Sequence, residues 1–282
     1  MILRVKDLVY HFPRPTLVMG VLNVTPDSFS DGSKYLDASA AIDHGISLLA
    51  CGADWIDIGG ESTRPGASQV TSAEEIRRVI PVIHGLRAKT DAIISIDTQK
   101  ADVAHAAIAE GAQIVNDIGA NRGDSEMCEL IARTGVGYVL MHMQGTPQSM
   151  QSNPSYGNVT QEVKSFLRER LAFLKESGVN FEQVVLDVGI GFGKTFQHNL
   201  DLMANLDLLH DLKRPILVGV SRKSFLGEAT SAPLQDRLAG GLSCAAWAIQ
   251  AGVQIVRTHD VAETRQAARM TELLLKTKHE RG

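Results

Sequence analysis

Asp97, Asn116 and Asp187 are the side chains best suited to recognise a polar ligand. Each lies within a short apolar run, in IISIDT, IVNDI and VVLDVG, where we expect it to be largely buried. A buried carboxylate is costly unless it is paired or hydrogen-bonded. The three together suit a flat ligand whose adjacent N–H donors a carboxylate grips with two hydrogen bonds. For any one of them, tying down a loop through backbone N–H groups is the alternative.

A second group of residues is cationic. Arg222 and Lys223 follow the run ILVGVS, and Arg257 and His259 close the run IVRTH, two residues apart and so expected on one side of a strand. Together they fit an anion with several negative oxygens, such as a phosphate group. An inward structural ion pair is the alternative for Arg222. Residues 260–263, DVAE, indicate a helix start whose N–H groups would add to the same positive field.

Asn23, at the end of LVMGVLN, is a candidate Mg²⁺ ligand beside such an anion, because Mg²⁺ keeps several waters and takes few protein ligands. The chain has no His/Cys/Asp cluster typical of zinc sites, no GxSxG elbow and no P-loop. GIGFGK, from Gly189 to Lys194, is rich in glycine but lacks P-loop spacing. We interpret it as a tight loop that lets the backbone and Phe192 approach a ligand.

The elements that must position these residues are eight short apolar runs, each ending in or just before a polar residue. The polar residues are Asn23, Asp57 with Glu61, Asp97, Asn116, His142, Asp187, Ser221 with Arg222 and Lys223, and Arg257 with His259. This pattern predicts a (β/α)₈ TIM barrel, whose reactive groups lie at the carboxyl ends of the strands. A doubly wound open sheet would show the same alternation, but no GxGxxG fingerprint follows the first run.

Between these runs lie helical patterns, such as Ala40 to Ala50 and Ser72 to Leu86. Five glycines each follow a helical stretch and precede the next strand, as expected where a helix ends in a positive φ. These are Gly52, Gly111, Gly135, Gly178 and Gly252. The repeated helix-to-strand connection supports the alternation of the barrel.

The 282 residues suit one domain, with residues 1–15 as a cap over the barrel bottom. Three long loops follow the first, second and fifth strands and belong to the active face: Thr25 to Lys34, Glu61 to Thr71, and Met143 to Asn158. Long loops of this kind are often lids. For the third, a passive surface excursion is the alternative.

Composition narrows the class of protein. A formal net charge of −4 gives no basic footprint for nucleic acid. No run approaches the ~18 apolar residues of a membrane span, and the first residues lack a signal peptide. Cys51, Cys128 and Cys244 are scattered, which favours reduced thiols. We therefore expect a cytoplasmic protein with neither a membrane nor a nucleic-acid partner.

Taken in order, the motifs resemble those of the dihydropteroate synthase family over ~Thr16 to Ala268. The segments that carry the resemblance are NVTPDSFSDG (23–32), GGESTRPGA (59–67), SIDT (95–98), VNDI (115–118), LMHMQGTP (140–147), GFGK (191–194), VGVSRKSF (218–225) and RTHD (257–260). The resemblance implies condensation of 6-hydroxymethyl-7,8-dihydropterin diphosphate with 4-aminobenzoate to 7,8-dihydropteroate and diphosphate. It also implies Mg²⁺, a homodimer and sulfonamide sensitivity.

The resemblance also assigns residues. It implies that Asp97, Asn116, Asp187 and Lys223 bind the pterin, that Met141 and Phe192 line the pterin and aminobenzoate sites, and that Asn23, Arg257 and His259 serve the diphosphate and Mg²⁺. It places Thr63, Pro65, Ser224 and Phe29 near aminobenzoate. As catalytic residues we take Asp97, Lys223 and Arg257.

The implied reaction is dissociative, because diphosphate is a good leaving group once neutralised and the electron-rich pterin tolerates a cationic carbon. Asp97 would stabilise the developing positive charge. Loops after the first two strands would close over the site. Asp31, or Asp27, on one loop and Arg64 on the other are the expected partners in closure.

Two departures from the family pattern stand beside Asp187. Val188 and Ile190, in LDVGIGFGK, replace a proline and an aromatic residue, and we expect them to affect only the affinity for pterin. The alternatives are a methyltetrahydrofolate-binding barrel of corrinoid methyltransferases and a non-catalytic pterin-binding module. The first should lack the TPDSFSDG and SRKSF segments, and the second should have a broken anion site; both segments and the cations are present.

Overall fold

A closed barrel of eight parallel strands forms the centre of the protein, in the order β10-β3-β4-β5-β6-β7-β8-β9. This computed structural model describes residues 1–25, 34–63, 67, 69–120, 122 and 126–280. The strands are β3 (Leu17–Asn23), β4 (Trp55–Gly59), β5 (Ile93–Asp97), β6 (Ile114–Asp117), β7 (Gly137–Met141), β8 (Val184–Asp187), β9 (Ile216–Gly219) and β10 (Ile255–Thr258). The predicted (β/α)₈ barrel is confirmed, and closure of the ring rules out an open sheet.

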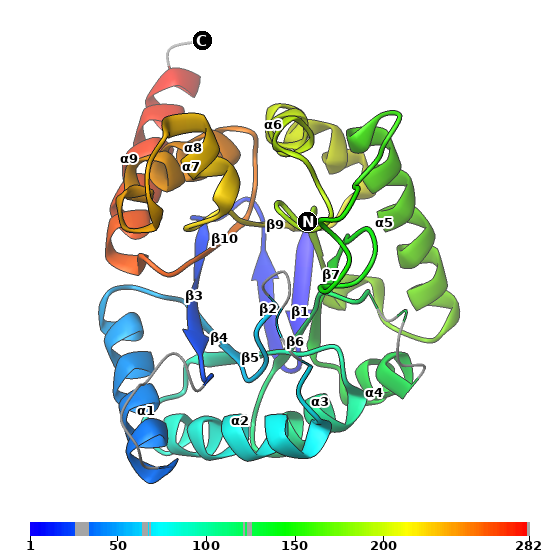
Figure 1. Cartoon of the computed structure of the whole chain (residues 1–282), viewed down its shortest axis with the longest axis vertical. Coiled ribbons are helices and arrows are strands. Elements are labelled where there is room, and N and C mark those ends of the chain that lie inside the picture. Colours follow the sequence, from blue (N-terminus) through cyan, green and yellow to red (C-terminus); the bar gives the residue numbers. More distant parts are fainter. Residues whose placement is uncertain (26–33, 64–66, 68, 121, 123–125, 281–282) are drawn as a thin grey trace.

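Helices surround the strands as an outer ring (Figure 1). The helices are α1 (Lys34–Ala50), α2 (Ser72–Arg87), α3 (Ala101–Ala109), α4 (Glu126–Thr134), α5 (Val159–Glu176), α6 (Phe196–Ala204), α7 (Ser224–Thr230), α8 (Leu238–Gln250) and α9 (Val261–His279). Short 3₁₀ turns span Phe181–Gln183, Leu206–Leu212 and Leu234–Asp236. The two helical patterns read from the sequence fall within α1 and α2.

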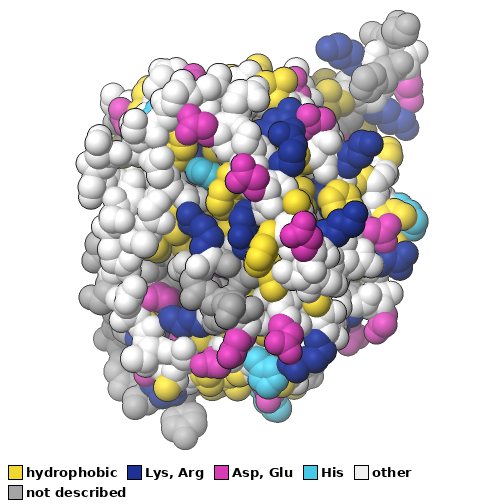
Figure 2. Space-filling view, turned by 90° about the vertical axis from the view of Figure 1, so that its right-hand side faces the viewer, with side chains coloured by type: hydrophobic (Ala, Val, Ile, Leu, Met, Phe, Trp, Pro, Cys, Tyr) yellow, Lys and Arg dark blue, Asp and Glu magenta, His cyan; other side chains and the backbone are white. Residues whose placement is uncertain are grey.

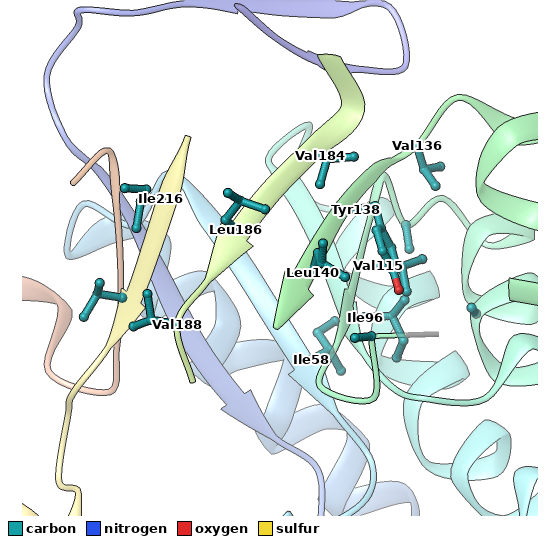
Figure 3. Close-up of a cluster of buried hydrophobic side chains, with 14 of the residues drawn as sticks. Ile58, Ile96, Val115, Val136, Tyr138, Leu140, Val184, Leu186, Val188 and Ile216 are labelled. Atoms are coloured by element: carbon teal, nitrogen blue, oxygen red, sulfur yellow. The ribbon is translucent and has the colours of Figure 1, made fainter. Parts of the chain in front are cut away.

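The main core lies between the barrel and the helices. Strand residues that face outward, including Ile58, Ile96, Val115 and Leu186, are fully buried against the helices (Figure 3). Because neighbouring residues of a strand face opposite sides, the residues between them point into the barrel. The strands are therefore apolar on both sides over most of their length, as parallel strands usually are.

The first residues form a hairpin beneath the barrel. β1 (Ile2–Val5) pairs antiparallel with β2 (Leu8–His11). Leu3, Val5 and Phe12 join one apolar cluster with inward-facing residues from the starts of the strands, among them Trp55 and Ile114. The hairpin thus covers the amino ends of the strands, opposite the end that carries the polar side chains.

The five glycines read as helix ends have φ angles from +67° to +108°. Each follows a helix, namely α1, α3, α4, α5 or α8. Glycine enters this region at little cost, whereas other residues are strained there. These positions let each helix stop sharply and the chain return to the barrel as the next strand.

On the face shown in Figure 2, basic and acidic side chains are interspersed with apolar ones. The described helices include none with the length and apolar character needed to cross a membrane. Among the described residues, buried polar and charged side chains gather inside the mouth of the barrel.

Candidate active site

Five inward-facing side chains form a polar layer above the apolar floor of the barrel. They are Asp57 on β4, Asp97 on β5, Asn116 on β6, Asp187 on β8 and Arg257 on β10. Each follows an apolar residue of the barrel floor on its own strand, by four residues for Asp97 and by two for the others. These floor residues are Trp55, Ile93, Ile114, Val185 and Ile255. An even spacing along a strand keeps side chains on the same face. The layer therefore lies toward the carboxyl ends, where barrel enzymes place their active sites.

Arg257 joins two carboxylates across this layer. Its Nε atom lies 2.6 Å from Oδ2 of Asp57, and its Nη2 atom lies 2.8 Å from Oδ2 of Asp97. Burial alone would lower the pKa of the guanidinium, but the two carboxylates outweigh it and raise the pKa above its ordinary value. Arg257 is therefore a permanent positive charge held in a fixed orientation.

Asp57 is the residue that the sequence reading left out of the site. It is fully buried, its Oδ2 also accepts a hydrogen bond of 2.9 Å from Nδ2 of Asn116, and its Oδ1 has no partner. The run WIDIG is apolar except for this carboxylate, just as IISID is apolar around Asp97. The same pattern could therefore have predicted Asp57 as a site residue. Asp57 fixes both Arg257 and Asn116 from below.

Asp97 has an unusually high pKa. Burial raises the pKa of its carboxyl to about 7, with the carboxylate of Asp57 adding to the rise, although Arg257 acts in the opposite direction. Its Oδ1 is buried without a hydrogen-bond partner. An acceptor that is held in place and left unpaired is well suited to a ligand donor or a developing positive charge.

Asp187 and Lys223 form the opposite side of the layer. Oδ1 of Asp187 accepts a 2.7 Å hydrogen bond from the backbone N–H of Gly189, and burial raises the pKa of this carboxyl. Burial lowers the pKa of Lys223 to about 8, although Asp187 acts against the change. The Lys223 amine donates to the carbonyl of Ile190 and lies 4.7 Å from the centre of the Phe192 ring.

Gly189, in the glycine-rich loop, packs too closely against the neighbouring backbone for a side chain. A Cβ on Gly189, which has a φ of +66°, would lie 1.9 Å from the carbonyl oxygen of His142. The buried amine of Lys194 then ties the loop down, since it lies 3.0 Å from Nδ1 of His142 and donates to the carbonyl of Phe192 at 2.9 Å. The interpretation of residues 189–194 as a tight loop agrees with this packing.

An apolar wall adjoins the loop. Met141, Met143, Met150 and Ile118 form one cluster, against which Phe192 packs half-buried. Ile190, in contrast, is fully buried in the main core between barrel and helices. Its side chain is therefore part of the core, and not a lost aromatic contact at the pocket as the sequence suggested.

The loop after β7 contributes to this wall. Its Met143 and Met150 are buried, the hydroxyl of Tyr156 donates to the carbonyl of Gly193 at 2.7 Å, and Gln151 donates to the carbonyl of Gly191 at 2.6 Å. These contacts favour a role in shaping the site over a passive surface excursion.

Arg257 and His259 turn to different partners. His259 lies one residue beyond β10, and its Nδ1 atom is 3.1 Å from Oγ of Ser221. Arg222, in the left-handed region with a φ of +61°, pairs with Asp260 through a 2.6 Å contact and remains half exposed. Arg222 is therefore in an ion pair, but the pair is half exposed and not the inward one expected as the alternative to an anion site.

Asn23 lies at the mouth, as the last residue of β3. A Cβ on its neighbour Gly59 would be 3.6 Å from Oδ1 of Asn23 and 3.6 Å from Cβ of Asp97. The amide oxygen thus borders the polar layer across a glycine. One neutral oxygen fits an Mg²⁺ that takes its other ligands from water and a bound diphosphate. The described residues include no cluster of three or more His, Cys, Asp or Glu able to hold a metal.

Two of the remaining candidates lie in the described part of the chain, beyond strand ends. Ser224 is the first residue of α7, and Thr63 lies four residues beyond β4. The candidates Phe29, Asp31, Arg64 and Pro65, together with Asp27, lie outside the described residues.

The chain is similar to known proteins over most of its length. Residues 19–259 match the family of pterin binding enzymes. The dihydropteroate synthase of Escherichia coli K12 is 43% identical over 261 residues, which cover 93% of this chain and 92% of that protein. The Xanthomonas albilineans dihydropteroate synthase in complex with 7,8-dihydropteroate is 39% identical with a TM-score of 0.88, covering 98% of this chain and 99% of that one. The Yersinia pestis enzyme in a sulfonamide drug complex is 41% identical with a TM-score of 0.91, covering 98% and 100%.

Proposed function

This chain belongs to the pterin binding enzymes and, within them, to the dihydropteroate synthases. We propose that the polar layer binds the pterin and that Arg257 and His259 bind the diphosphate. The enzyme condenses 6-hydroxymethyl-7,8-dihydropterin diphosphate with 4-aminobenzoate, forming 7,8-dihydropteroate and releasing diphosphate in folate biosynthesis.

The pterin occupies the Asp187 side of the layer. Its 2-amino and N3–H edge presents two adjacent donors, which match the two oxygens of the Asp187 carboxylate. Asn116 and Lys223 bind other polar atoms of the ring system. The apolar cluster of Met141 with Phe192 borders the same space and covers the flat face of the ring.

Asp97 and Arg257 serve the reacting carbon and its leaving group. As the bond to diphosphate breaks, positive charge develops on the exocyclic carbon and the pterin, and the unpaired Oδ1 of Asp97 stabilises it. The amine of 4-aminobenzoate then attacks this carbon, forms the C–N bond and releases a proton to water. No strong general base is required, because the carbon is already cationic when it is attacked. Arg257 and His259 bind the diphosphate oxygens.

Asn23 is the proposed protein ligand of Mg²⁺. When bound, the metal supplies positive charge that neutralises the departing diphosphate. The position of the Asn23 amide oxygen beside Gly59 and Asp97 supports this assignment.

The aminobenzoate site is assigned from motif likeness. Thr63, Pro65, Ser224 and Phe29 border this substrate, and Asp31 with Arg64 are proposed to pair when the loops after β3 and β4 close. Of these six residues, only Thr63 and Ser224 lie in the described part of the chain.

The observation that carries the proposal is the ion pair of Arg257 with Asp97 inside a barrel mouth that also holds Asn116, Asp187 and Lys223. The test is diphosphate release with Mg²⁺, dihydropterin diphosphate and 4-aminobenzoate, each omitted in turn. Release should depend on all three. Pterin binding without turnover would count against the roles of Arg257 and His259, and an unchanged rate without Mg²⁺ would count against Asn23 as a metal ligand.

We further propose that the enzyme is sensitive to sulfonamides, which mimic 4-aminobenzoate. The segment Thr63 to Gly66 has no additional residue of the kind that marks resistant relatives. Micromolar sulfamethoxazole should inhibit the purified enzyme in competition with 4-aminobenzoate. Full activity under those conditions would refute the proposal.

The homodimer implied by the resemblance has a candidate interface on α8 and α9. Trp247 on α8 is 52% exposed, and Met270, Leu273 and Leu274 on α9, which packs against α8, are 55%, 53% and 60% exposed. Exposed apolar side chains of this size favour an interface. Sedimentation velocity should show a dimer, and Leu274→Glu should dissociate it. Val9→Glu, on the exposed β2 at the far end of the barrel, is the matched control.

The scattered cysteines suit a reducing compartment, and we propose a cytoplasmic location.

A further inference from the structure

Lys100 lies outside the polar layer, at the start of α3, and its amine gathers three partners. Nζ lies 2.7 Å from Oε2 of Glu61, 2.5 Å from Oε2 of Glu75 and 2.7 Å from the carbonyl oxygen of Val70. The Lys100 side chain is 26% exposed and that of Glu75 is fully buried. An ammonium group has three donors, and here the three protein acceptors use all of them.

These partners sit at the two ends of the loop after β4. Glu61 lies two residues beyond β4 and Val70 two residues before α2. Oε1 of Glu61 also accepts a 2.9 Å hydrogen bond from the backbone N–H of Val70. Lys100 and Glu61 together close the base of the loop, because one amine and one carboxylate hold both of its ends.

The start of the loop is fixed from the other side as well. A Cβ on Gly60 would lie 2.7 Å from Val79 and 3.0 Å from Cγ of Glu75, so the backbone there packs directly against α2. Nη1 of Arg78 donates to the carbonyl of Gly60 at 2.9 Å. The residue before it, Gly59, separates Asn23 from Asp97 at the barrel mouth. Because α2 and Arg78 hold Gly60, a shift at Glu61 should move the chain beyond it, toward Thr63, and leave Gly59 in place.

We propose that Lys100 is a positioning residue for the 4-aminobenzoate side of the site: with Glu61 and Glu75 it fixes the base of the β4–α2 loop, and so sets Thr63 at the mouth without touching substrate. Thr63 lies two residues beyond Glu61, whereas Asp187, Asn116 and Lys223, which form the pterin side, come from other strands and loops. This proposal rests on the proposed function, because it assigns the loop to one of the two substrates.

The consequence is a difference between the two substrates. Loss of the Lys100 amine should displace Thr63. A misplacement on the order of 1 Å can cost up to about 10²-fold in rate. We expect Lys100→Met to raise the KM for 4-aminobenzoate by about tenfold or more. The affinity for the pterin substrate, measured by calorimetry without 4-aminobenzoate, should change by less than about twofold, because its residues keep their contacts.

Lys100→Met leaves the buried carboxylate of Glu75 without its cation and can destabilise the fold, so a second variant is needed. Glu61→Ala removes both bonds across the loop base but leaves Lys100 paired with Glu75. It should raise the KM for 4-aminobenzoate in the same way. Lys100→Arg keeps the charge and donors and should restore much of the loss. Lys89→Met, which removes an exposed ion pair with Asp43, is the matched control and should leave both constants unchanged.

The wild-type assay separates this proposal from the proposed function. If the wild-type enzyme shows no turnover that depends on both substrates, the proposed function is wrong, and the role of Lys100 in binding 4-aminobenzoate is wrong with it. With wild-type turnover established, an unchanged KM for 4-aminobenzoate in Glu61→Ala, or equal losses of pterin and aminobenzoate binding in the folded variants, would overturn the positioning role.

Discussion

The Nη2 atom of Arg257 lies 2.8 Å from Oδ2 of Asp97, so the cation assigned to the leaving group and the carboxylate assigned to the developing cation form one ion pair before substrate binds. Asp57 holds the same guanidinium through Nε at 2.6 Å. The orientation of Arg257 is therefore set by the enzyme and not by the ligand. Such preorganisation is the main source of electrostatic stabilisation in enzymes.

Arg257→Lys should fail to restore this arrangement. A lysine ammonium lacks the planar fork that reaches Asp57 and Asp97 at once, so one carboxylate would lose its partner. We expect kcat/KM to fall by about 10²-fold or more, with little recovery relative to Arg257→Met. Steady-state diphosphate release measures it, and Arg77→Met, which removes an exposed ion pair on α2, should behave as wild type. Near-normal activity of Arg257→Lys would show that a point charge is enough.

Asp97 should give the reaction a pH dependence near neutrality. If the carboxylate is the active form, kcat/KM should rise with pH and level off above the pKa of about 7. Asp97→Asn should lose this step along with about 10²-fold in rate. A profile of the wild type that is flat from pH 5 to 9 would contradict the assignment.

The same group affects stability with a definite sign. The folded protein keeps the Asp97 proton up to about pH 7, whereas the unfolded chain releases it near the ordinary value of 3.8. The unfolded state therefore binds fewer protons in this interval, and the contribution of Asp97 to stability decreases as pH rises from about 4 to 7. Urea unfolding at pH 5 and 7.5 should show Asp97→Asn gaining stability relative to wild type at the higher pH.

Gly189→Ala tests the packing of the glycine-rich loop. The new Cβ would meet the carbonyl of His142 at 1.9 Å, and the φ of +66° would add strain. We expect a loss of at least about 2 kcal/mol in the free energy of unfolding, together with weaker pterin binding because Asp187 depends on the Gly189 N–H. Gly157→Ala is the control, since its nearest neighbour would be 3.6 Å away. Equal stability of both variants would mean that the loop readily adjusts.

Much of the site could be predicted because it follows from strand ends. Parallel strands in a closed ring bring their carboxyl ends to one face, so Asp97, Asn116 and Asp187 had to converge once eight strands were counted. The pairing within that face depends on side-chain depth and direction, which the sequence does not show. Asp57 was missed for this reason: it stood among the strand-end polar residues, but its hydrogen bonds with Arg257 and Asn116 depend on side-chain direction.

The residues beyond the strand ends were harder to place. Arg222 follows β9 by three residues and turns outward in the left-handed region to meet Asp260, although its neighbours in sequence suggested an anion site. Ile190 stands between two glycines whose conformations direct its side chain into the core. Such directions depend on loop conformation, which no spacing rule specifies.

Lys194 provides the sharpest test of how the loop is held. Burial lowers the pKa of its amine well below the ordinary value of 10.5, although Asp187 acts against the change. Between the lowered pKa of the folded protein and the ordinary pKa of 10.5, the unfolded chain binds a proton that the folded protein lacks. The contribution of Lys194 to stability therefore increases with pH in this interval. Lys194→Met removes that dependence. Wild type should therefore gain stability relative to Lys194→Met from pH 7 to 10 in urea unfolding, whereas exposed Lys175→Met should run parallel to wild type. A constant difference between wild type and Lys194→Met would mean that the buried amine stays charged, and its bonds to His142 and Phe192 would then be those of an ammonium group.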